Sequence, residues 1–425
     1  MSKRLIVIGA GAAGLACAHD LKARGYEVIV LEARPRIGGR VWSDDRLGFA
    51  LDLGASWIMG AAKNPLSAIA GAARIELVPT HWDRLAVYRG GARVSARELD
   101  QTDQEFADLI DAVRRRARSR SADVTLQAAI EDELRGEVLT PSDRDRLNYA
   151  CAMLGQDAAA DMDELGTTGQ EYDRPPRGED ALVRGGYQAV LAALAAGLDI
   201  RLDHEVTQIE QRGDSVLVTT PSETFTGAGC VVSLPLGVLQ SGRIRFTPAL
   251  PADKQAVVRR LGMGTLNKAT LLFPRSVIPS SLDFLGRMGS EPTRFPLFVN
   301  LERLTSHPAV LGFVAGHTAR ALESASDAQV VDAALRSLRD LLGASLPTPT
   351  AALVTRWHSD PHALGSYSYI PPGAKESDRD LLATPIGNHL YFCGEATQRN
   401  QAGTVHGAYL SGKRAASQVV SRLPP

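Results

Sequence analysis

The first forty residues alternate between short apolar runs and segments of small or polar residues. Residues 5–8 are continuously apolar, the pattern of a strand that is buried on both faces of a parallel sheet. A glycine-rich loop over residues 9–14 follows at once, and residues 15–24 have the pattern of a helix that ends before a glycine. A second apolar stretch over residues 27–31 ends at Glu32. The chain therefore begins with a predicted strand, glycine loop, helix and strand.

The glycine spacing gives this unit a chemical meaning. Gly9 allows a tight turn, Gly11 lets the backbone approach a pyrophosphate, and Gly14 lets the helix pack closely on the strand. The N-terminus of the helix then offers free N–H groups and a positive dipole end to phosphate. Glu32 lies where a carboxylate can accept hydrogen bonds from both ribose hydroxyls. These residues predict a Rossmann-type dinucleotide site and leave open whether the ligand is NAD or FAD.

The residues after Glu32 include a second glycine pair, Gly38 and Gly39, and three arginines ending at Arg40. This stretch resembles the extended FAD-binding motif of the glutathione-reductase-like flavoproteins, and specifically that of the flavin amine oxidase family. The resemblance implies that the glycine pair and Arg40 lie against the FAD diphosphate, whose oxygens an arginine can bind in a forked geometry. Without the resemblance, the arginines could belong to an ordinary polar loop.

The resemblance extends over nearly the whole chain. Residues 52–60 look like the family segment beside the isoalloxazine ring, and residues 183–273 and 391–408 are also close matches, whereas residues 81–180 match least. The motif and the resemblance together predict FAD contacts at Gly9, Gly11, Ala13, Gly14, Glu32, Ala33, Arg34, Gly38, Gly39, Arg40, Gly54, Ala55, Ser56, Trp57, Val206, Gly394, Glu395, Thr404 and Val405.

Lys268 is the candidate catalytic residue. Residues 266–273 have the alternation of a strand, which places Lys268 on an otherwise apolar face. A lysine is seldom fully buried without a partner, although it can also extend along a sheet edge to reach solvent. The resemblance implies that Lys268 holds a water beside flavin N5, where a lysine with a lowered pKa would suit proton transfer.

The resemblance also suggests how substrate and flavin are held. Tyr367 matches one wall of the aromatic cage that presents the amine to the flavin, and Trp357 matches a family tryptophan near the ring. Monoamine oxidases carry their flavin-linking cysteine at the position of Ser366, and serine cannot form that thioether. We therefore predict FAD that is not covalently bound.

Two substrate-side positions depart from the family pattern. The second cage wall of monoamine oxidases is a tyrosine, and the matching residue here is Thr404. Polyamine oxidases often carry Glu or His where this chain has Met59. We predict that both residues contact substrate, and the sequence offers no evident partner there for a second amine.

The chain of 425 residues is too long for one ordinary core, so we expect two domains. The predicted fold class is α/β (α+β overall), with a discontinuous Rossmann-type FAD-binding domain and a substrate-binding domain in which helices flank a mixed sheet. We assign residues 1–80, 180–262 and 385–425 to the first domain, and residues 81–179 and 263–384 to the second. Residues 81–179 are charged and mainly helical by pattern, with helices expected over 104–118 and 124–135 and a proline-rich break at 174–178.

Composition and charge limit the kinds of binding partner that we expect. The net charge of −1 gives no argument for nucleic acid or a membrane surface, and we interpret the arginine-rich residues 114–120 as a solvated helix face. The four cysteines are far apart and form no CxxC pair, so we expect no metal site. Because the first strand begins almost at once, we expect no signal peptide and a cytoplasmic protein. Besides its small-molecule substrate and dioxygen, a homodimer is the one further partner we consider.

The leading functional hypothesis is an FAD-dependent oxidase of a primary or secondary amine. A C–H bond beside the nitrogen would deliver hydride to flavin N5, giving an imine that hydrolyses to an aldehyde or ketone, while dioxygen is reduced to hydrogen peroxide. An L-amino-acid oxidase is the first alternative, and it would need an arginine facing the flavin, for which Arg84 is a candidate. A desaturase and a non-catalytic flavoprotein stay open as further alternatives.

Overall fold

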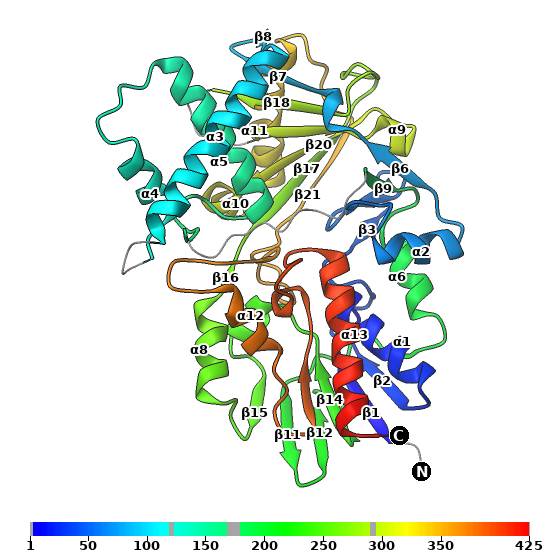
Figure 1. Cartoon of the computed structure of the whole chain (residues 1–425). Helices are drawn as coiled ribbons and strands as arrows, with labels where there is room; N and C mark the ends of the chain where they lie inside the picture. The colour runs from blue at the N-terminus through cyan, green and yellow to red at the C-terminus, as the bar shows by residue number, and fades with distance from the viewer. Residues whose placement is uncertain (1–2, 119–122, 168–178, 290–294, 425) are drawn as a thin grey trace.

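The computed structural model describes residues 3–118, 123–167, 179–289 and 295–424 (Figure 1). Its helices are α1 Ala12–Ala23, α2 Pro65–Ala72, α3 Ala96–Ala117, α4 Leu126–Glu133, α5 Pro141–Ala158, α6 Gln188–Ala195, α7 Leu236–Gln240, α8 Ala252–Arg260, α9 Glu302–Thr305, α10 Gly316–Leu322, α11 Asp327–Leu342, α12 Glu376–Ala383 and α13 Val405–Arg422, with short 3₁₀ turns η1 Trp82–Arg84 and η2 Glu395–Thr397.

A five-stranded parallel sheet forms one half of the molecule, in the order β10-β2-β1-β14-β23. Its strands are β1 Arg4–Ile8, β2 Glu27–Leu31, β10 Asp199–Arg201, β14 Gly229–Val232 and β23 Leu390–Phe392. Helices α1 and α13 lie side by side against this sheet (Figure 1), so closely that a Cβ at Gly412 would lie 2.1 Å from the carbonyl oxygen of Ala13. The first and last helices of the chain therefore belong to one layer on this sheet.

A seven-stranded sheet forms the other half, in the order β21-β17-β20-β19-β18-β7-β8. Its strands are β7 Leu85–Arg89, β8 Ala92–Arg93, β17 Leu266–Leu272, β18 Phe284–Met288, β19 Leu297–Asn300, β20 Ala309–Ala315 and β21 Ala351–Val354. The β7–β18 pair is parallel and the other pairs are antiparallel, so the sheet is mixed, as predicted. Helix α11 packs on one face, and Tyr149 of α5 lies close to Gly286 in β18.

Smaller sheets complete the fold. The remaining strands are β3 Ser43–Asp44, β4 Leu51–Asp52, β5 Trp57–Ile58, β6 Leu77–Thr80, β9 Asp180–Val183, β11 Gln208–Arg212, β12 Ser215–Thr219, β13 Thr224–Gly227, β15 Arg245–Thr247, β16 Gly262–Met263 and β22 Ser368–Tyr369. Strand β9 pairs with both β5 and β6, and β16 pairs with β22. These pairs tie segments far apart in the sequence to the region between the two large sheets.

The helical prediction for residues 81–179 holds only in part. Helices α3 and α4 cover the expected positions, but residues 85–93 form strands β7 and β8 of the mixed sheet. Helix α5 was not predicted, because its sequence carries no strong apolar periodicity. The proline-rich break at 174–178 and part of the arginine-rich stretch lie outside the described residues. Helix α12, from the range expected in the substrate-binding domain, packs against α8. The domain boundaries stay predictions.

The four cysteines are free, and Cys17, Cys230 and Cys393 are buried. No described helix combines the length and the apolar character that a membrane span requires.

Candidate active site

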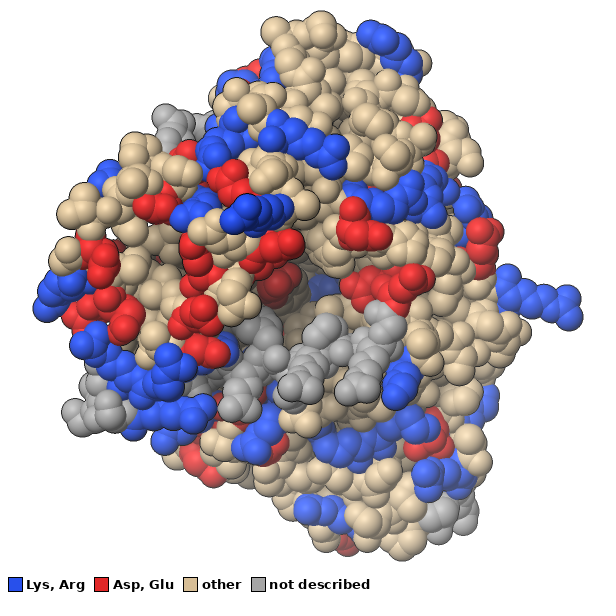
Figure 2. Space-filling view, turned by 45° about the horizontal axis from the view of Figure 1, so that its top comes forward, with Lys and Arg blue, Asp and Glu red and all other residues tan. Residues whose placement is uncertain are grey.

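A cavity of about 780 Å³ lies between the two large sheets, with walls contributed by both. Every predicted contact residue except Gly14 lines it, although these residues come from segments spread over the whole chain. Figure 2 shows a hollow in one face of the molecule with acidic side chains gathered around it. The geometry therefore unites the predicted cofactor and substrate residues in one space.

The glycine loop is shaped by close contacts. Gly9 has φ +97°, and a Cβ there would lie 2.8 Å from Oγ of Ser233. A Cβ at Gly14 would lie 1.9 Å from the carbonyl oxygen of Gly9, which no side chain could tolerate. Gly14 thus allows the helix and the loop to pack together, but it does not itself line the cavity. Gly11, whose Cβ would meet no atom within 3.4 Å, borders open space.

The first turn of α1 suits an anionic ligand. Its N-cap residue, Gly11, has no side chain to satisfy the N–H groups of the turn, and the turn contains no acidic residue. Glu32 is buried, and its carboxylate accepts the N–H of Ala10 at 2.7 Å and the N–H of Arg34 at 3.0 Å. Each oxygen keeps a lone pair that can accept a ribose hydroxyl. A helix N-terminus beside a fixed carboxylate fits the diphosphate and ribose of a dinucleotide.

The three arginines after Glu32 have different surroundings. Arg34 forms an ion pair with Asp360 at 2.6 Å, and Arg40 forms one with Glu395 at 2.9 Å. Both arginines line the cavity. Arg36 does not, because its guanidinium stacks on the Trp42 ring with 4.6 Å between the guanidinium carbon and the ring centroid.

Glu395 is the centre of a buried polar network. Its carboxylate accepts hydrogen bonds from Arg40, from Oγ of Ser368 at 2.7 Å and from the N–H of Gly403 at 2.9 Å. The buried Arg379 donates in turn to Oγ of Ser368. Burial alone would raise the pKa of Glu395, but Arg40 and Arg379 outweigh it and hold the pKa below its usual range. The network fixes a permanent anion between two cations beside the cavity.

Lys268 lies in β17 and is 5% exposed, so it is not the edge lysine that the alternation also allowed. Its Nζ donates to the carbonyl oxygen of Asp52 at 2.9 Å, to Oγ of Ser56 at 2.6 Å and to the carbonyl oxygen of Gly54. Burial lowers the pKa of Lys268 to about 8, partly opposed by the nearby carboxyl of Asp52, whose own pKa is raised to about 6 by burial. A lysine in this state can change its protonation near neutral pH.

Aromatic residues shape the wall near Lys268. Trp357 is buried, and its indole N–H donates to the carbonyl oxygen of Leu53 at 3.2 Å. The Trp357 ring lies so close to Gly54 that an added Cβ there would approach it to 3.3 Å. Phe313 lies with its ring centroid 5.6 Å from Nζ of Lys268. Trp357 and Phe313 thus make the cavity wall near Lys268 aromatic.

Tyr367 spans the cavity wall between two distant elements. A Cβ at Gly403 would lie 3.2 Å from its ring, and its hydroxyl donates to the carbonyl oxygen of Gln156 in α5 at 2.5 Å. The neighbouring Ser366 exchanges hydrogen bonds with the backbone of Leu266, donating at 2.9 Å and accepting at 2.8 Å. Tyr367 is thus held at both ends, which suits a residue that positions a ligand.

The comparison with known proteins decides the family. The family model of flavin containing amine oxidoreductases matches residues 12–420. The chain belongs to this family. It is 36% identical to polyamine oxidase 2 of Arabidopsis thaliana, over 99% of this chain and 89% of the relative.

Two further relatives show the range of the family. The chain is 33% identical to lysine-specific histone demethylase 2 of Homo sapiens, over 99% of this chain but 54% of the demethylase. Among solved structures, a redesigned putrescine oxidase superposes with a TM-score of 0.80 at 18% identity, covering 99% of this chain and all of the other. The latter likeness concerns the fold.

Membership makes this protein an FAD-dependent amine oxidase of the flavin-containing amine oxidoreductases. The residues present fit FAD, since the cavity joins an open helix N-terminus, the Glu32 carboxylate and the Arg40–Glu395 pair. At the other end Thr404 caps α13 by accepting the N–H of Gly407 at 2.9 Å, and Val405 follows it in the cavity wall. The role of each residue toward FAD stays a prediction.

Arg84 does not meet the requirement set for the amino-acid alternative. Its guanidinium donates to the carbonyl oxygens of Ser280 at 2.7 Å and Ser281 at 2.9 Å, and it is absent from the cavity lining. An arginine held in this way cannot face a substrate carboxylate in the cavity.

Several cavity residues were not predicted from the sequence. They include Trp82, Met153, Gln156, Asp157, Asp180, Phe284, Leu297, Phe313 and Arg379. Met153, Gln156 and Asp157 belong to α5, within the stretch that resembles the family least. Acidic residues at the end of a helix are common on protein surfaces, so the sequence carried no signal that separated Asp157 from them.

Proposed function

We propose that this protein oxidises a primary or secondary amine to an imine, which hydrolyses to an aldehyde or ketone, and that dioxygen is the electron acceptor. When bound, FAD would supply the redox chemistry, in which the C–H bond beside the nitrogen is oxidised and dioxygen is reduced to hydrogen peroxide. The observation that carries the proposal is the buried Lys268 inside a cavity that also contains the dinucleotide motif. Two named relatives, a polyamine oxidase and a histone demethylase, are compatible with amine substrates.

The protein would bind and orient the substrate and would exclude water from the site. Tyr367 and the apolar side chains of Phe284, Leu297 and Phe313 would hold the substrate chain and exclude water. Met59 and Thr404 also line the cavity, and we assign them substrate contacts. A site without water favours the neutral amine over the ammonium form. The neutral amine is the form that can release hydride, because its nitrogen keeps a lone pair.

Lys268 would accept and return a proton during the reaction. All three donors of its ammonium group are already used by Asp52, Gly54 and Ser56. We infer that a water held by Lys268 takes the place of the Ser56 hydroxyl, because this is the only one of the three acceptors that can rotate away. The pKa of about 8 lets Lys268 accept or return a proton at working pH.

An amine panel with peroxide detection tests the proposed function. Primary and secondary amines should release peroxide and should bleach the flavin when oxygen is excluded. Turnover of L-amino acids without turnover of simple amines would favour the first alternative, in which an arginine other than Arg84 would have to bind the carboxylate. A flavin that no amine bleaches would overturn the proposal and leave the desaturase and non-catalytic alternatives.

Two further expectations accompany the proposal. Acid precipitation should release the flavin into the supernatant, since Ser366 offers no thiol for a covalent bond. Yellow colour that stays with the pellet would contradict this. Cell fractionation and light scattering test the expected cytoplasmic location and the homodimer.

A further inference from the structure

Asp157 is an unpaired acid inside the cavity. It lies in the last turn of α5, and its side chain is exposed to the space that the cavity encloses. Within the described residues its carboxylate has no hydrogen bond or ion pair, so its oxygens are available to a ligand in the cavity. The surrounding protein raises the pKa of Asp157 to about 6 through burial. Such a carboxylate would be stabilised by a cationic ligand group.

The position of Asp157 relates it to the reacting end of a substrate. The backbone carbonyl oxygen of the preceding residue, Gln156, accepts a hydrogen bond from the hydroxyl of Tyr367. The ring of Tyr367 packs at its other end on Gly403, which precedes the N-cap of α13. The backbone just before Asp157 is therefore one tyrosine side chain away from the C-terminal motif. A ligand that extends from that motif along Tyr367 would bring its far end to Asp157.

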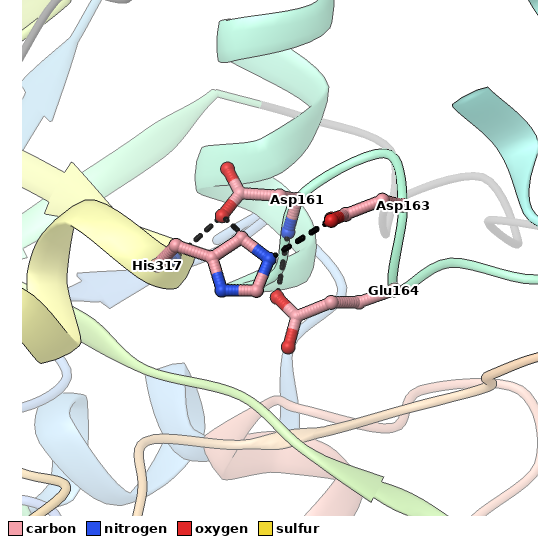
Figure 3. Close-up of side chains that lie close together, drawn as sticks. All are labelled: Asp161, Asp163, Glu164 and His317. Atoms are coloured by element: carbon pink, nitrogen blue, oxygen red, sulfur yellow. Dashed lines mark hydrogen bonds and ion pairs between the residues drawn. The ribbon is translucent and has the colours of Figure 1, made fainter.

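The loop after α5 holds this helix end in place. Ala159 has φ +54°, and its carbonyl oxygen accepts the N–H of Thr265, just before β17, at 2.7 Å. Figure 3 shows Asp161, Asp163, Glu164 and His317 close together, with Asp161 accepting the backbone N–H of His317. The backbone that follows Asp157 is thus tied to β17 and α10.

The guanidinium of Arg320 occupies the position beside this cluster that a metal ion would need. It donates to Glu164 at 2.7 Å and lies 2.8 Å from Nδ1 of His317. We treat the cluster as a link between α5 and α10.

We propose that Asp157 binds the distal ammonium group of a diamine or polyamine whose other amine is oxidised at the flavin. This inference rests on the proposed amine oxidation and names its substrate class. It supplies the acid partner that the sequence did not offer at Met59, and the acidic rim of the hollow in Figure 2 would attract such polycations. Asp180 is the other cavity acid on this side, but its Oδ1 already accepts the N–H of Gly60 at 2.8 Å.

The test compares amines matched in length, using the FAD-loaded enzyme. Steady-state kinetics with 1,4-diaminobutane and spermidine are set against butylamine and hexylamine. Wild type should prefer the diamine and triamine. Asp157→Asn should lower kcat/KM for them by about 10- to 100-fold, mainly through KM, and should leave the monoamines within about twofold.

Three control variants keep the result interpretable. Asp163→Asn removes the same charge from the same segment, at an exposed residue outside the cavity lining, and should leave the preference intact. Asp157→Glu keeps the charge and should restore much of the preference. The FAD content and melting temperature of each variant show that it is folded. If Asp180→Asn abolishes the preference and Asp157→Asn does not, the assignment to Asp157 is wrong.

The outcomes separate this inference from the function it rests on. Wild type that turns over no amine would overturn the proposed function. Wild type that oxidises amines, with a diamine preference unaffected in Asp157→Asn, would overturn only the role of Asp157. An equal loss for diamines and monoamines would also overturn it, because a merely structural role predicts that pattern.

Discussion

The two halves of the cavity are built by different means. On the predicted cofactor half, backbone segments approach one another closely, and glycines at fixed spacing allow this, as Gly9 and Gly14 show. On the substrate half, side chains such as Asp157 and Phe313 line the wall from elements with no local signature. A site made from backbone constrains the sequence strongly, because only glycine fits certain positions. A site made from side chains can be reached from many sequences.

The largest expected effect comes from the backbone half. Gly14→Ala places a methyl group 1.9 Å from the carbonyl oxygen of Gly9, so α1 or the loop must move. We expect loss of most bound FAD and a drop of more than about 2 kcal/mol in the free energy of unfolding. Flavin absorbance per protein and urea denaturation measure the two effects.

Gly71→Ala is the matched control. Gly71 also lies in a helix, α2, but an added Cβ there meets no atom within 4 Å. Alanine favours the helical state over glycine, so this variant should be as stable as wild type or more stable by up to about 1 kcal/mol. Equal FAD content in the two variants would show that the contact at Gly14 does not matter for cofactor binding.

This contrast explains how much the sequence could predict. The Rossmann-type unit, the strand around Lys268 and the cavity positions of the C-terminal motif follow from local patterns and from the family resemblance. Strand β7 was wrongly included in a helical region because its apolar run is short. Its place in the mixed sheet depends on pairing with β18, which lies almost two hundred residues later.

The unpredicted site residues share a physical cause. Arg379 matters because it reaches Ser368 and, through it, Glu395, a contact set by how α12 packs. Asp157 matters because the end of α5 lies over the cavity. Neither property depends on neighbouring residues in the sequence, so tertiary packing alone reveals it.

The next largest effect concerns Lys268, which joins the two halves. Lys268→Met keeps the apolar stem and removes the charge and the three hydrogen bonds to Asp52, Gly54 and Ser56. We expect flavin reduction or reoxidation to slow by about 100-fold, a usual effect of losing a general acid or base, with FAD still bound. Stopped-flow absorbance measures both half-reactions.

Lys268→Arg tests whether charge alone is enough. Arginine stays protonated in proteins, so it cannot accept a proton at this site. It should therefore fail to restore the rate. Normal turnover in the methionine variant would remove the proposed proton role.

A smaller effect on flavin reduction is expected from removing the charge of Asp52, the carboxylate near Lys268. Oδ1 of Asp52 accepts hydrogen bonds from Ser43 at 2.6 Å and from the N–H of Tyr187 at 2.9 Å, and its negative charge raises the pKa of Lys268 against the effect of burial. Asp52→Asn removes that charge, so the pKa of Lys268 should fall below its value of about 8. The limb of the pH profile that rises as Lys268 loses its proton should move to lower pH, by up to about one unit. Flavin reduction measured from pH 6 to 10 tests this, and an unmoved limb would assign it to another group.

The smallest effect should come from His317, at the surface end of the substrate half. Its side chain is 58% exposed and lies 3.1 Å from Asp163, and exposed pairs of this kind stabilise proteins by at most about 1 kcal/mol. His317→Ala keeps the backbone N–H that donates to Asp161, so Asp157 should stay in place and the KM for diamines should not change. Asp161→Ala removes the acceptor and should raise that KM. If His317→Ala raises the KM for diamines as much as Asp157→Asn does, then exposed side chains, and not the backbone of the loop after α5, set the direction of the cavity carboxylate.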